Sequence, residues 1–375
     1  MRLHVISFNI PYPPNYGGVM EVYYKLKALH EEGVEIHLHC FEYGRNESPE
    51  LNKICASVHY YHRDHSLRDF TSLTPYIVKT RRSEALVDNL LKDDAPILFE
   101  GLHTCYYLSD ERLKDRLKLV RMHNVESDYY HDLGVSESKL ARKFYFYTEA
   151  IKLKFFEKIL ANADYVLAIS PADYDHLKDK YNHVEYLPSF HPNEHVKSMP
   201  GNGDFILYHG NLGVNENNQA AVWLVSKVFS QLPDYKFVVA GSSPSDTLKK
   251  LIDKQPHVEL IESPNLEHMT RLWSEAHVHA LSTFQSTGIK QKLLHSLFNG
   301  RFVLTNPPMV DNTGLERLCV VAENATKMVE IIPTLMQTEF TQTDIDQREA
   351  MLQTNFSNRT NAQKLMRWLS LVPNP

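Results

Sequence analysis

Hydrophobic and polar positions follow two different periods along this chain. Short apolar runs with the length of buried strands alternate with segments whose apolar residues recur every three or four positions, as in an amphipathic helix. In the first half, the expected strands span residues 3–8, 34–41, 96–100, 117–122 and 165–169. The pattern predicts parallel strands connected by helices.

A segment of different composition interrupts this alternation. Residues 187–203 hold three prolines, two glycines and few periodic apolar positions, which is typical of a linker. After it, the expected strands span residues 204–210, 236–241, 257–262, 277–282 and 301–305. The sequence therefore predicts two doubly wound α/β domains.

The expected domains are 1–187 and 204–342, with the linker at 188–203 and a helical segment at 343–375. The apolar face of that last segment, around Trp368, needs a partner. It could cap the second domain or cross back to the first.

Composition narrows the class of protein. The chain has 375 residues, 43% of them hydrophobic and 23% charged, which fits a globular protein of two or three domains. A formal charge of −6 argues against nucleic acid as a partner. Four cysteines without a C-x-x-C pair, and no signal-peptide pattern or apolar run of spanning length, predict a cytoplasmic protein.

A pair of glycines, Gly17 and Gly18, lies between the first expected strand and the first expected helix. Glycine lets the backbone approach a ligand closely, and the N–H groups at a helix start attract anions. The alternative is a flexible turn in a proline-rich loop. The G-x-G-x-x-G fingerprint is absent, so a nicotinamide cofactor is not predicted.

Polar side chains also follow two neighbouring strands of the first domain. Glu100 and His103 close one strand, whereas His123, Asn124 and Glu126 follow the next. The carboxyl ends of parallel strands form the ligand edge of the sheet. There, imidazole and carboxylate groups can bond sugar hydroxyls or transfer a proton. Alternatively, Asn124 caps a helix and Glu126 lies in its first turn.

In the second domain, the residues suited to an anion lie at the start of a helix. Gly288 precedes Lys290 and Lys292, and the helix dipole adds to their positive charge. Gly210 and Asn211 end the first strand of this domain and lie at its ligand edge. The pattern predicts a phosphate site, and the alternative is a solvated basic face.

Two further patterns bear on metal binding and on membrane contact. Histidines are abundant, but none has metal-ligand spacing, so neither a metal site nor a bound cofactor is predicted. A helix expected at 138–161 mixes basic residues with aromatics. It could touch a membrane surface, but its aromatics surround more than one face, which favours a core helix of the first domain.

Taken together, these segments resemble a known family, the retaining glycosyltransferases of family 4, which have the GT-B fold. The segments that carry the resemblance are PYPPNYGGVMEVYYKL, RMHNVESDYY, EKILANADYVLAISPAD, LYHGNLGVNENNQAAVWL and STGIKQKLLHSLFNGRFVLT. The resemblance implies two Rossmann-like doubly wound domains facing a central cleft, with the last helix crossing back to the first domain.

The resemblance also implies an activity. It is the metal-independent transfer of a sugar, with retention, from a nucleoside diphosphate sugar to a glycan or lipid-linked acceptor. Such an enzyme would serve polysaccharide biosynthesis in the cytoplasm, at the inner face of a membrane with which it associates peripherally.

By the same resemblance, His123 and Lys292 are the catalytic residues. His123 would contact the donor sugar, and Lys292 would neutralise the leaving diphosphate. The expected donor-binding residues are Gly17, Gly18, Gly210, Asn211, Gly288, Ile289, Lys290, Lys292 and His295.

The chain departs from the family pattern at three places. Thr287 and His295 stand where the family has two glutamates, and Asn217 and Asn218 occupy the neighbourhood of a basic residue. Two alternatives remain open. One is a sugar-nucleotide epimerase of the same fold, and the other is a non-catalytic relative that lost the donor site.

Overall fold

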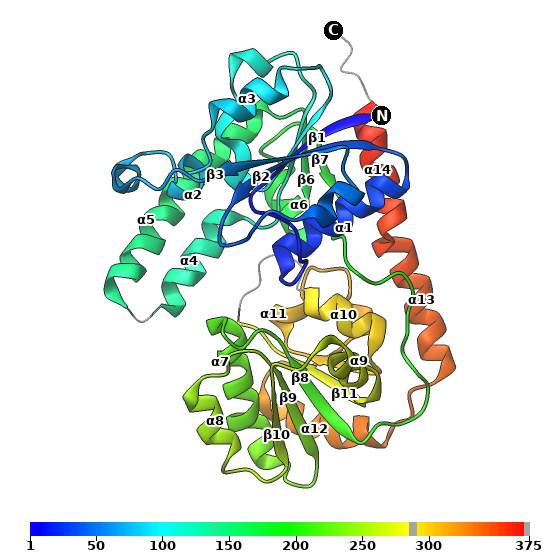
Figure 1. Cartoon of the computed structure of the whole chain (residues 1–375). Coiled ribbons are helices and arrows are strands. Elements are labelled where there is room, and N and C mark those ends of the chain that lie inside the picture. Colours follow the sequence, from blue (N-terminus) through cyan, green and yellow to red (C-terminus); the bar gives the residue numbers. More distant parts are fainter. Residues whose placement is uncertain (138, 285–290, 371–375) are drawn as a thin grey trace. The chain divides into compact units, whose positions relative to one another are not determined.

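The computed structural model of the chain describes residues 1–137, 139–284 and 291–370, which divide into two compact units (Figure 1). Unit 1 comprises Met1–Pro192 and the C-terminal segment from Phe356, and unit 2 comprises Asn193–Asn355. The segment expected to be a linker is therefore shared between the units, and the helical segment after residue 342 is divided between them at Phe356.

Unit 1 is built on a parallel sheet whose described strands run in the order β3-β2-β1-β4-β5-β6-β7. The strands are β1 (Arg2–Ser7), β2 (Glu35–Glu42), β3 (Ser57–His62), β4 (Ile97–Glu100), β5 (Lys118–Arg121), β6 (Tyr165–Ala168) and β7 (Val184–Tyr186). The strand order reverses between β1 and β4. Ligands of doubly wound sheets bind beyond the carboxyl ends of the strands at such a reversal.

Two strands of this sheet were missed by the hydrophobic pattern. Strand β3 lies at one edge of the sheet, and Tyr61 is its only buried residue. Strand β7 lies at the other edge, and its three residues are half-buried. Apolar periodicity cannot mark a strand that buries so little apolar surface.

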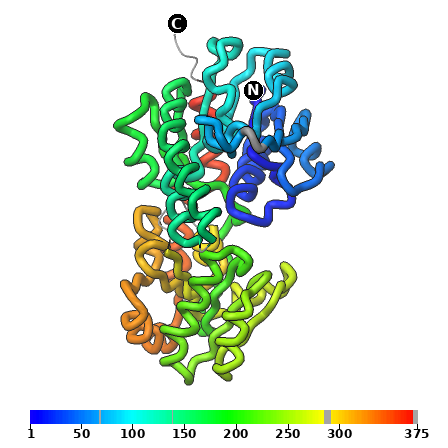
Figure 2. The backbone as a smooth tube through the Cα atoms, turned by 90° about the vertical axis from the view of Figure 1, so that its left-hand side faces the viewer, coloured from blue at the N-terminus to red at the C-terminus, as the bar shows by residue number. Residues whose placement is uncertain are grey.

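Helices cover both faces of the unit 1 sheet (Figure 1). They are α1 (Gly17–Glu31), α2 (Tyr76–Lys79), α3 (Glu84–Leu90), α4 (Glu126–Ser136), α5 (Leu140–Phe156), α6 (Pro171–Leu177) and α14 (Asn358–Ser370). The last helix, α14, packs against α1, and Leu365 and Leu369 join Val22 and Leu26 in one buried core (Figures 1 and 2). Apolar residues at helical spacing on both helices explain this contact.

Unit 2 repeats the same plan with the described strand order β10-β9-β8-β11-β12-β13, all parallel. The strands are β8 (Phe205–His209), β9 (Lys236–Gly241), β10 (Val258–Glu262), β11 (Val278–Leu281), β12 (Phe302–Thr305) and β13 (Val320–Val321). Their order reverses between β8 and β11, so the predicted ligand edge of this sheet lies after His209 and Leu281.

The helices of unit 2 connect these strands. They are α7 (Asn215–Trp223), α8 (Asp246–Ile252), α9 (Leu266–Glu275), α10 (Gln291–Asn299), α11 (Pro307–Val310), α12 (Ala325–Gln337) and α13 (Gln342–Phe356). The helix expected at 216–232 is α-helical only to Trp223 and continues as a π-helical turn over Leu224–Val228. The predicted fold class, two doubly wound α/β domains, is confirmed.

Candidate functional site

In unit 1, Glu100 and His123 meet at the reversal of strand order. Glu100 ends β4 and His123 follows β5, and His123 Nε2 lies 2.9 Å from Glu100 Oε2. Lys25 Nζ donates to both carboxylate oxygens of Glu100, at 2.7 and 2.8 Å. Burial raises the pKa of Glu100, but Lys25 and His123 together lower it by more than burial raises it. The net pKa of Glu100 is therefore below its ordinary value. An ionised carboxylate only accepts hydrogen bonds, so His123 Nε2 carries a proton.

A second buried carboxylate extends this network. Glu21 Oε1 accepts from Arg121 Nε at 2.9 Å and lies 3.2 Å from Lys25 Nζ, and Glu21 Oε2 accepts from Ser189 Oγ at 3.0 Å. Burial raises the pKa of Glu21, but Arg121 and Lys25 outweigh it and lower the pKa to about 2. Alternating charges thus run from Arg121 through Glu21 and Lys25 to Glu100, which holds His123.

The network changes the role expected for Glu100. This residue was predicted to contact a sugar or an acceptor, but its side chain is completely buried. It positions His123 instead, whose side chain retains 9% exposure. Because Nε2 is held by Glu100, Nδ1 is the nitrogen that can meet a ligand.

His103 and Glu126 form a second pair beside the first. His103 Nδ1 lies 3.7 Å from Glu126 Oε1 and has no hydrogen-bond partner in the described part of the chain. Burial, and next the charge of Arg81, lowers the pKa of His103 well below its ordinary value. Burial raises the pKa of Glu126 to about 8, although a hydrogen bond from Asn124 opposes the shift. At neutral pH, this site holds a neutral imidazole beside a largely protonated carboxyl.

The surroundings of Asn124 also differ from expectation. Helix α4 begins at Glu126 with Val125 as its N-cap residue, and no side chain caps it. Asn124 does not act as the helix cap, and its side chain bonds to the Glu126 carboxyl instead.

The shifted pKa of Glu126 predicts a pH dependence of stability. The folded chain holds this proton more tightly than the unfolded chain, whose carboxyl has a pKa of 4.5. The stabilisation is therefore complete below pH 4.5 and declines as the pH rises towards about 8, by roughly 3–5 kcal/mol. The variant Glu126→Gln, which stays neutral, should lose this slope when unfolding by urea is measured from pH 5 to 8.5. An unchanged slope in the variant would contradict the assignment.

Gly17 and Gly18 are the first two residues of α1. Tyr16 precedes them in extended conformation, and no side chain caps the helix start. A Cβ atom on Gly18 would lie 2.9 Å from Cζ of Phe8, whose ring contacts His123 edge-on at 5.4 Å. Gly18 thus allows the helix start to approach the loop after β1, and the uncapped N–H groups suit an anion.

In unit 2, Lys292 lies in the first turn of α10. Its ammonium donates to Asn217 Oδ1 at 2.8 Å and lies 5.2 Å from the centre of the Tyr208 ring. Asn217 also packs under Gly210, where a Cβ atom would lie 3.3 Å from Asn217 Cγ. The amide that replaces the expected basic residue is therefore a direct partner of Lys292.

The loop after β8 is shaped by Asn211. Its Oδ1 accepts from Gly213 N at 3.0 Å and from Ser242 Oγ at 3.2 Å, and its carbonyl accepts from Asn217 Nδ2. Asn211 is exposed, but its side-chain oxygen already orders the loop. Gly288, Ile289 and Lys290, which complete the predicted anion site, lie outside the described residues.

His295 of α10 packs into a cluster of rings with Trp273 of α9, His209 of β8 and His279 of β11. Its ring centre lies 3.8 Å from that of Trp273, at an interplanar angle of 67°. Below it, Ser296 Oγ lies 3.0 Å from His209 Nε2 and 2.9 Å from His279 Nδ1. Burial lowers the pKa of His209 well below its ordinary value and that of His279 to about 4, so these two imidazoles are neutral at physiological pH.

Comparison with proteins of known structure identifies the fold. No family model matches the chain. An uncharacterised 44.6 kDa protein from the cps region of Klebsiella pneumoniae is 28% identical in an alignment of 330 residues that covers 84% of each chain. A glycosyltransferase from Rickettsia africae superposes with a TM-score of 0.68 at 12% identity, covering 99% of this chain and 98% of that one. The fold is GT-B.

Two further GT-B structures agree with this result. Anabaena HepE in complex with UDP and glucose superposes with a TM-score of 0.66 at 12% identity. The superposition covers 99% of this chain and 100% of HepE. An α,α-trehalose-phosphate synthase (UDP-forming) from Burkholderia vietnamiensis has a TM-score of 0.67 at 10% identity, with coverage of 98% and 96%. At these identities, the likeness establishes the fold of this chain.

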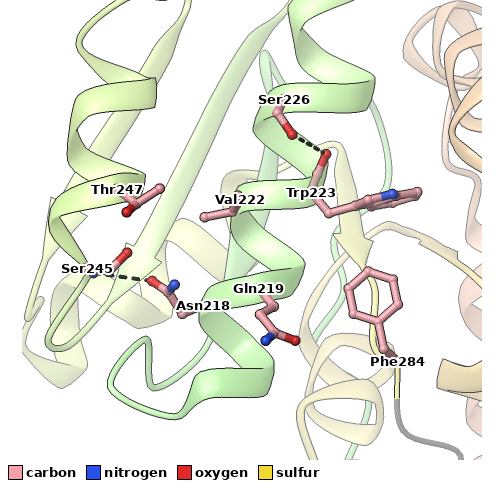
Figure 3. A pocket seen from close by; sticks show the side chains of 8 residues that line it. All are labelled: Asn218, Gln219, Val222, Trp223, Ser226, Ser245, Thr247 and Phe284. Atoms are coloured by element: carbon pink, nitrogen blue, oxygen red, sulfur yellow. Dashed lines mark hydrogen bonds between the residues drawn. The ribbon is translucent and has the colours of Figure 1, made fainter. Parts of the chain in front are cut away.

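A separate pocket of about 450 Å³ lies on unit 2 of this GT-B chain (Figure 3). It is lined by neutral polar and apolar side chains from α7, the π-helical turn, the start of α8 and the segment after β11. These are Asn218, Gln219, Val222, Trp223, Ser226, Ser245, Thr247 and Phe284. Without a charged side chain in its lining, the pocket does not suit a diphosphate.

The described residues contain neither a candidate metal site nor a membrane-spanning helix. Neither His, Cys, Asp nor Glu forms a group of three that could hold a metal ion there. In the same residues, no helix has both the length and the apolarity to cross a bilayer.

Sequence reasoning missed the charge network behind His123. Glu21 and Lys25 stand four positions apart on the face of α1 that also carries Val22 and Leu26. Two charged residues on a predicted apolar face are a signal of a buried pair. The sequence contains no corresponding signal for Arg121, which is predicted only to lie in the strand at 117–122.

Proposed function

We propose that this GT-B protein is a glycosyltransferase that moves a sugar from a nucleoside diphosphate sugar to a glycan or lipid-linked acceptor. The observation that carries the proposal is the ammonium of Lys292, held by Asn217 at the first turn of α10 and at the ligand edge of the unit 2 sheet. The solved structures of HepE with UDP, and with UDP and glucose, support a nucleotide sugar as the donor.

The donor diphosphate would be bound by positive charge and by backbone N–H groups. Lys292 supplies the charge, with Lys290 as its predicted companion, and Gly288 and Ile289 would supply N–H groups. Gly210 and Asn211 would contribute the loop after β8, and His295 would approach the ribose. Two ammonium groups can neutralise a leaving diphosphate, so we propose that transfer needs no metal ion.

The donor sugar would be contacted from unit 1. His123 offers Nδ1, because the Glu100 carboxylate holds Nε2 at 2.9 Å and fixes the ring. The uncapped start of α1 at Gly17 and Gly18 would add N–H groups near the diphosphate. Buried charges behind the imidazole keep this arrangement rigid, which favours precise placement of the sugar.

The acceptor would be held by His103 and Asn124 together with Glu126, whose side chain is 3% exposed and would act mainly through His103. A neutral imidazole accepts a hydrogen bond from a hydroxyl, whereas a protonated carboxyl donates one. This pair can thus orient an acceptor hydroxyl without adding charge to the site. We assign no catalytic base, and we propose that the sugar is transferred with retention, in the cytoplasm and at the inner face of a membrane.

A panel of ligands tests the donor assignment. UDP, GDP, ADP and their sugar conjugates are added separately, and thermal unfolding is recorded with each. A ligand at a hundred times its Kd adds about 2.7 kcal/mol of stability, which raises the unfolding temperature by several degrees. If no nucleotide raises it, the protein is a binding-deficient relative and the proposal is wrong.

The variant His123→Ala tests the sugar contact. Loss of this hydrogen-bonding group should lower the rate of transfer or donor hydrolysis about 10- to 100-fold. His131→Ala is the matched control, because that imidazole is 60% exposed and should leave the rate unchanged. Equal rates in both variants, or release of an epimerised nucleotide sugar without acceptor, would contradict the proposal.

A further inference from the structure

The outer face of α5 exposes a line of large apolar side chains. Leu140, Phe144, Ile151 and Phe155 are 83%, 72%, 59% and 67% exposed. At about 100° per residue, the four fall within about 60° of one another around the helix and extend over about 22 Å. We call them the α5 stripe. The expectation of a core helix is wrong for this face, because only Glu149, Ala150 and Leu153 of α5 are buried.

The charged side chains that α5 itself exposes are all basic. Lys154 and Lys158 are exposed and Lys143 is half-buried, and they lie along one side of the stripe. Their ammonium groups form no hydrogen bond or ion pair with any described residue. The two acids of this segment, Glu149 and Glu157, are buried, so they do not offset the lysines at the surface.

This combination is unusual for the chain as a whole. The protein carries a net charge of −6, yet the exposed side of α5 is cationic. An exposed apolar line beside unpaired lysines is the pattern of helices that lie in the interface of an anionic membrane, where the apolar side chains enter the acyl boundary and the lysines meet phosphate groups.

We propose that the α5 stripe and Lys143, Lys154 and Lys158 bind the surface of an anionic phospholipid bilayer. Charge complementarity favours lipid over a second copy of this chain. A symmetric dimer through α5 would bring the lysines of both copies together, which opposes association. The inference stands on exposure and charge, and it does not require that the glycosyltransferase assignment be correct.

Co-sedimentation with vesicles tests the proposal. The whole protein is mixed with vesicles of phosphatidylcholine alone or of phosphatidylcholine with phosphatidylglycerol, at low and at high salt. We expect binding to the anionic vesicles and its loss at high salt, because salt screens the lysines. Failure to pellet with the anionic vesicles would overturn the proposal.

Two variants assign the binding to this surface. Lys143→Ala/Lys154→Ala/Lys158→Ala should weaken partitioning about a hundredfold, since each lysine near an anionic surface contributes about fivefold. Phe144→Ser/Phe155→Ser should weaken it about tenfold or more. All five side chains are at least partly accessible, so the thermal midpoint should stay unchanged.

Matched controls come from unit 2. Leu266→Ser removes an apolar side chain that is 75% exposed, and Lys227→Ala/Lys250→Ala/Lys254→Ala removes three exposed lysines. Both should bind like the wild type. Equal losses in variants and controls would overturn the proposal, as would self-association that the α5 variants abolish. Loss of sugar transfer with intact vesicle binding would count against the proposed function alone.

Discussion

Replacing Lys292 with alanine is expected to lower kcat/KM for sugar transfer about 10²- to 10³-fold. The ammonium is held by Asn217 at the start of α10, where charge would develop on the leaving diphosphate of the proposed donor. Removing one preorganised donor from such a position costs about 2.7–4 kcal/mol of transition-state stabilisation. The measurement is the release of nucleoside diphosphate under steady-state conditions, together with the nucleotide-dependent shift in unfolding temperature.

Two further variants make this result interpretable. Lys250→Ala removes an exposed lysine of the same unit and should leave kcat/KM unchanged. Lys292→Arg keeps the charge but replaces a compact ammonium by a planar fork, so it should recover only part of the rate. Turnover of Lys292→Ala near that of the wild type would remove the main support for the proposed donor site.

Replacing Glu21 with glutamine is expected to destabilise unit 1 by about 3–5 kcal/mol. The change leaves the buried guanidinium of Arg121 without its carboxylate, and an uncompensated buried charge carries a penalty of this size. Glu50→Gln is the control, because Glu50 pairs with Lys53 at the surface and should change stability by less than about 1 kcal/mol.

Tryptophan fluorescence can report this effect for unit 1 separately. Of the three tryptophans, Trp368 belongs to unit 1, whereas Trp223 and Trp273 belong to unit 2. A Trp223→Phe/Trp273→Phe background therefore isolates the unfolding of unit 1 in urea. Similar midpoints for Glu21→Gln and Glu50→Gln would show that the network does not stabilise the unit.

The pKa of Glu21 sets the pH range of that measurement. A carboxyl with a pKa of about 2 in the folded unit and 4.5 in the unfolded chain stabilises fully above pH 4.5. The contribution is lost as the pH falls from 4.5 towards 2. The difference between wild type and Glu21→Gln should accordingly be constant at neutral pH and shrink in acid.

The sequence determined the two doubly wound sheets and most of their strands. Buried parallel strands are apolar throughout and helices are apolar at every third or fourth position, so β1, β8 and α1 are visible without a structure. The rule that ligands bind at the carboxyl ends of strands also indicated Glu100 and His123 before their contact was known. Both inferences rest on local periodicity and on a general property of parallel sheets.

Only the tertiary structure decided what those residues do. Arg121 and Glu21 are a hundred positions apart and meet because β5 and α1 pack in one unit, so no local pattern contains their ion pair. The same packing buries Glu100 and makes it a positioning residue. Conversely, the aromatic side chains on several faces of α5 predicted a core helix, yet no element of the described chain covers the α5 stripe. Burial depends on neighbours that sequence spacing does not specify.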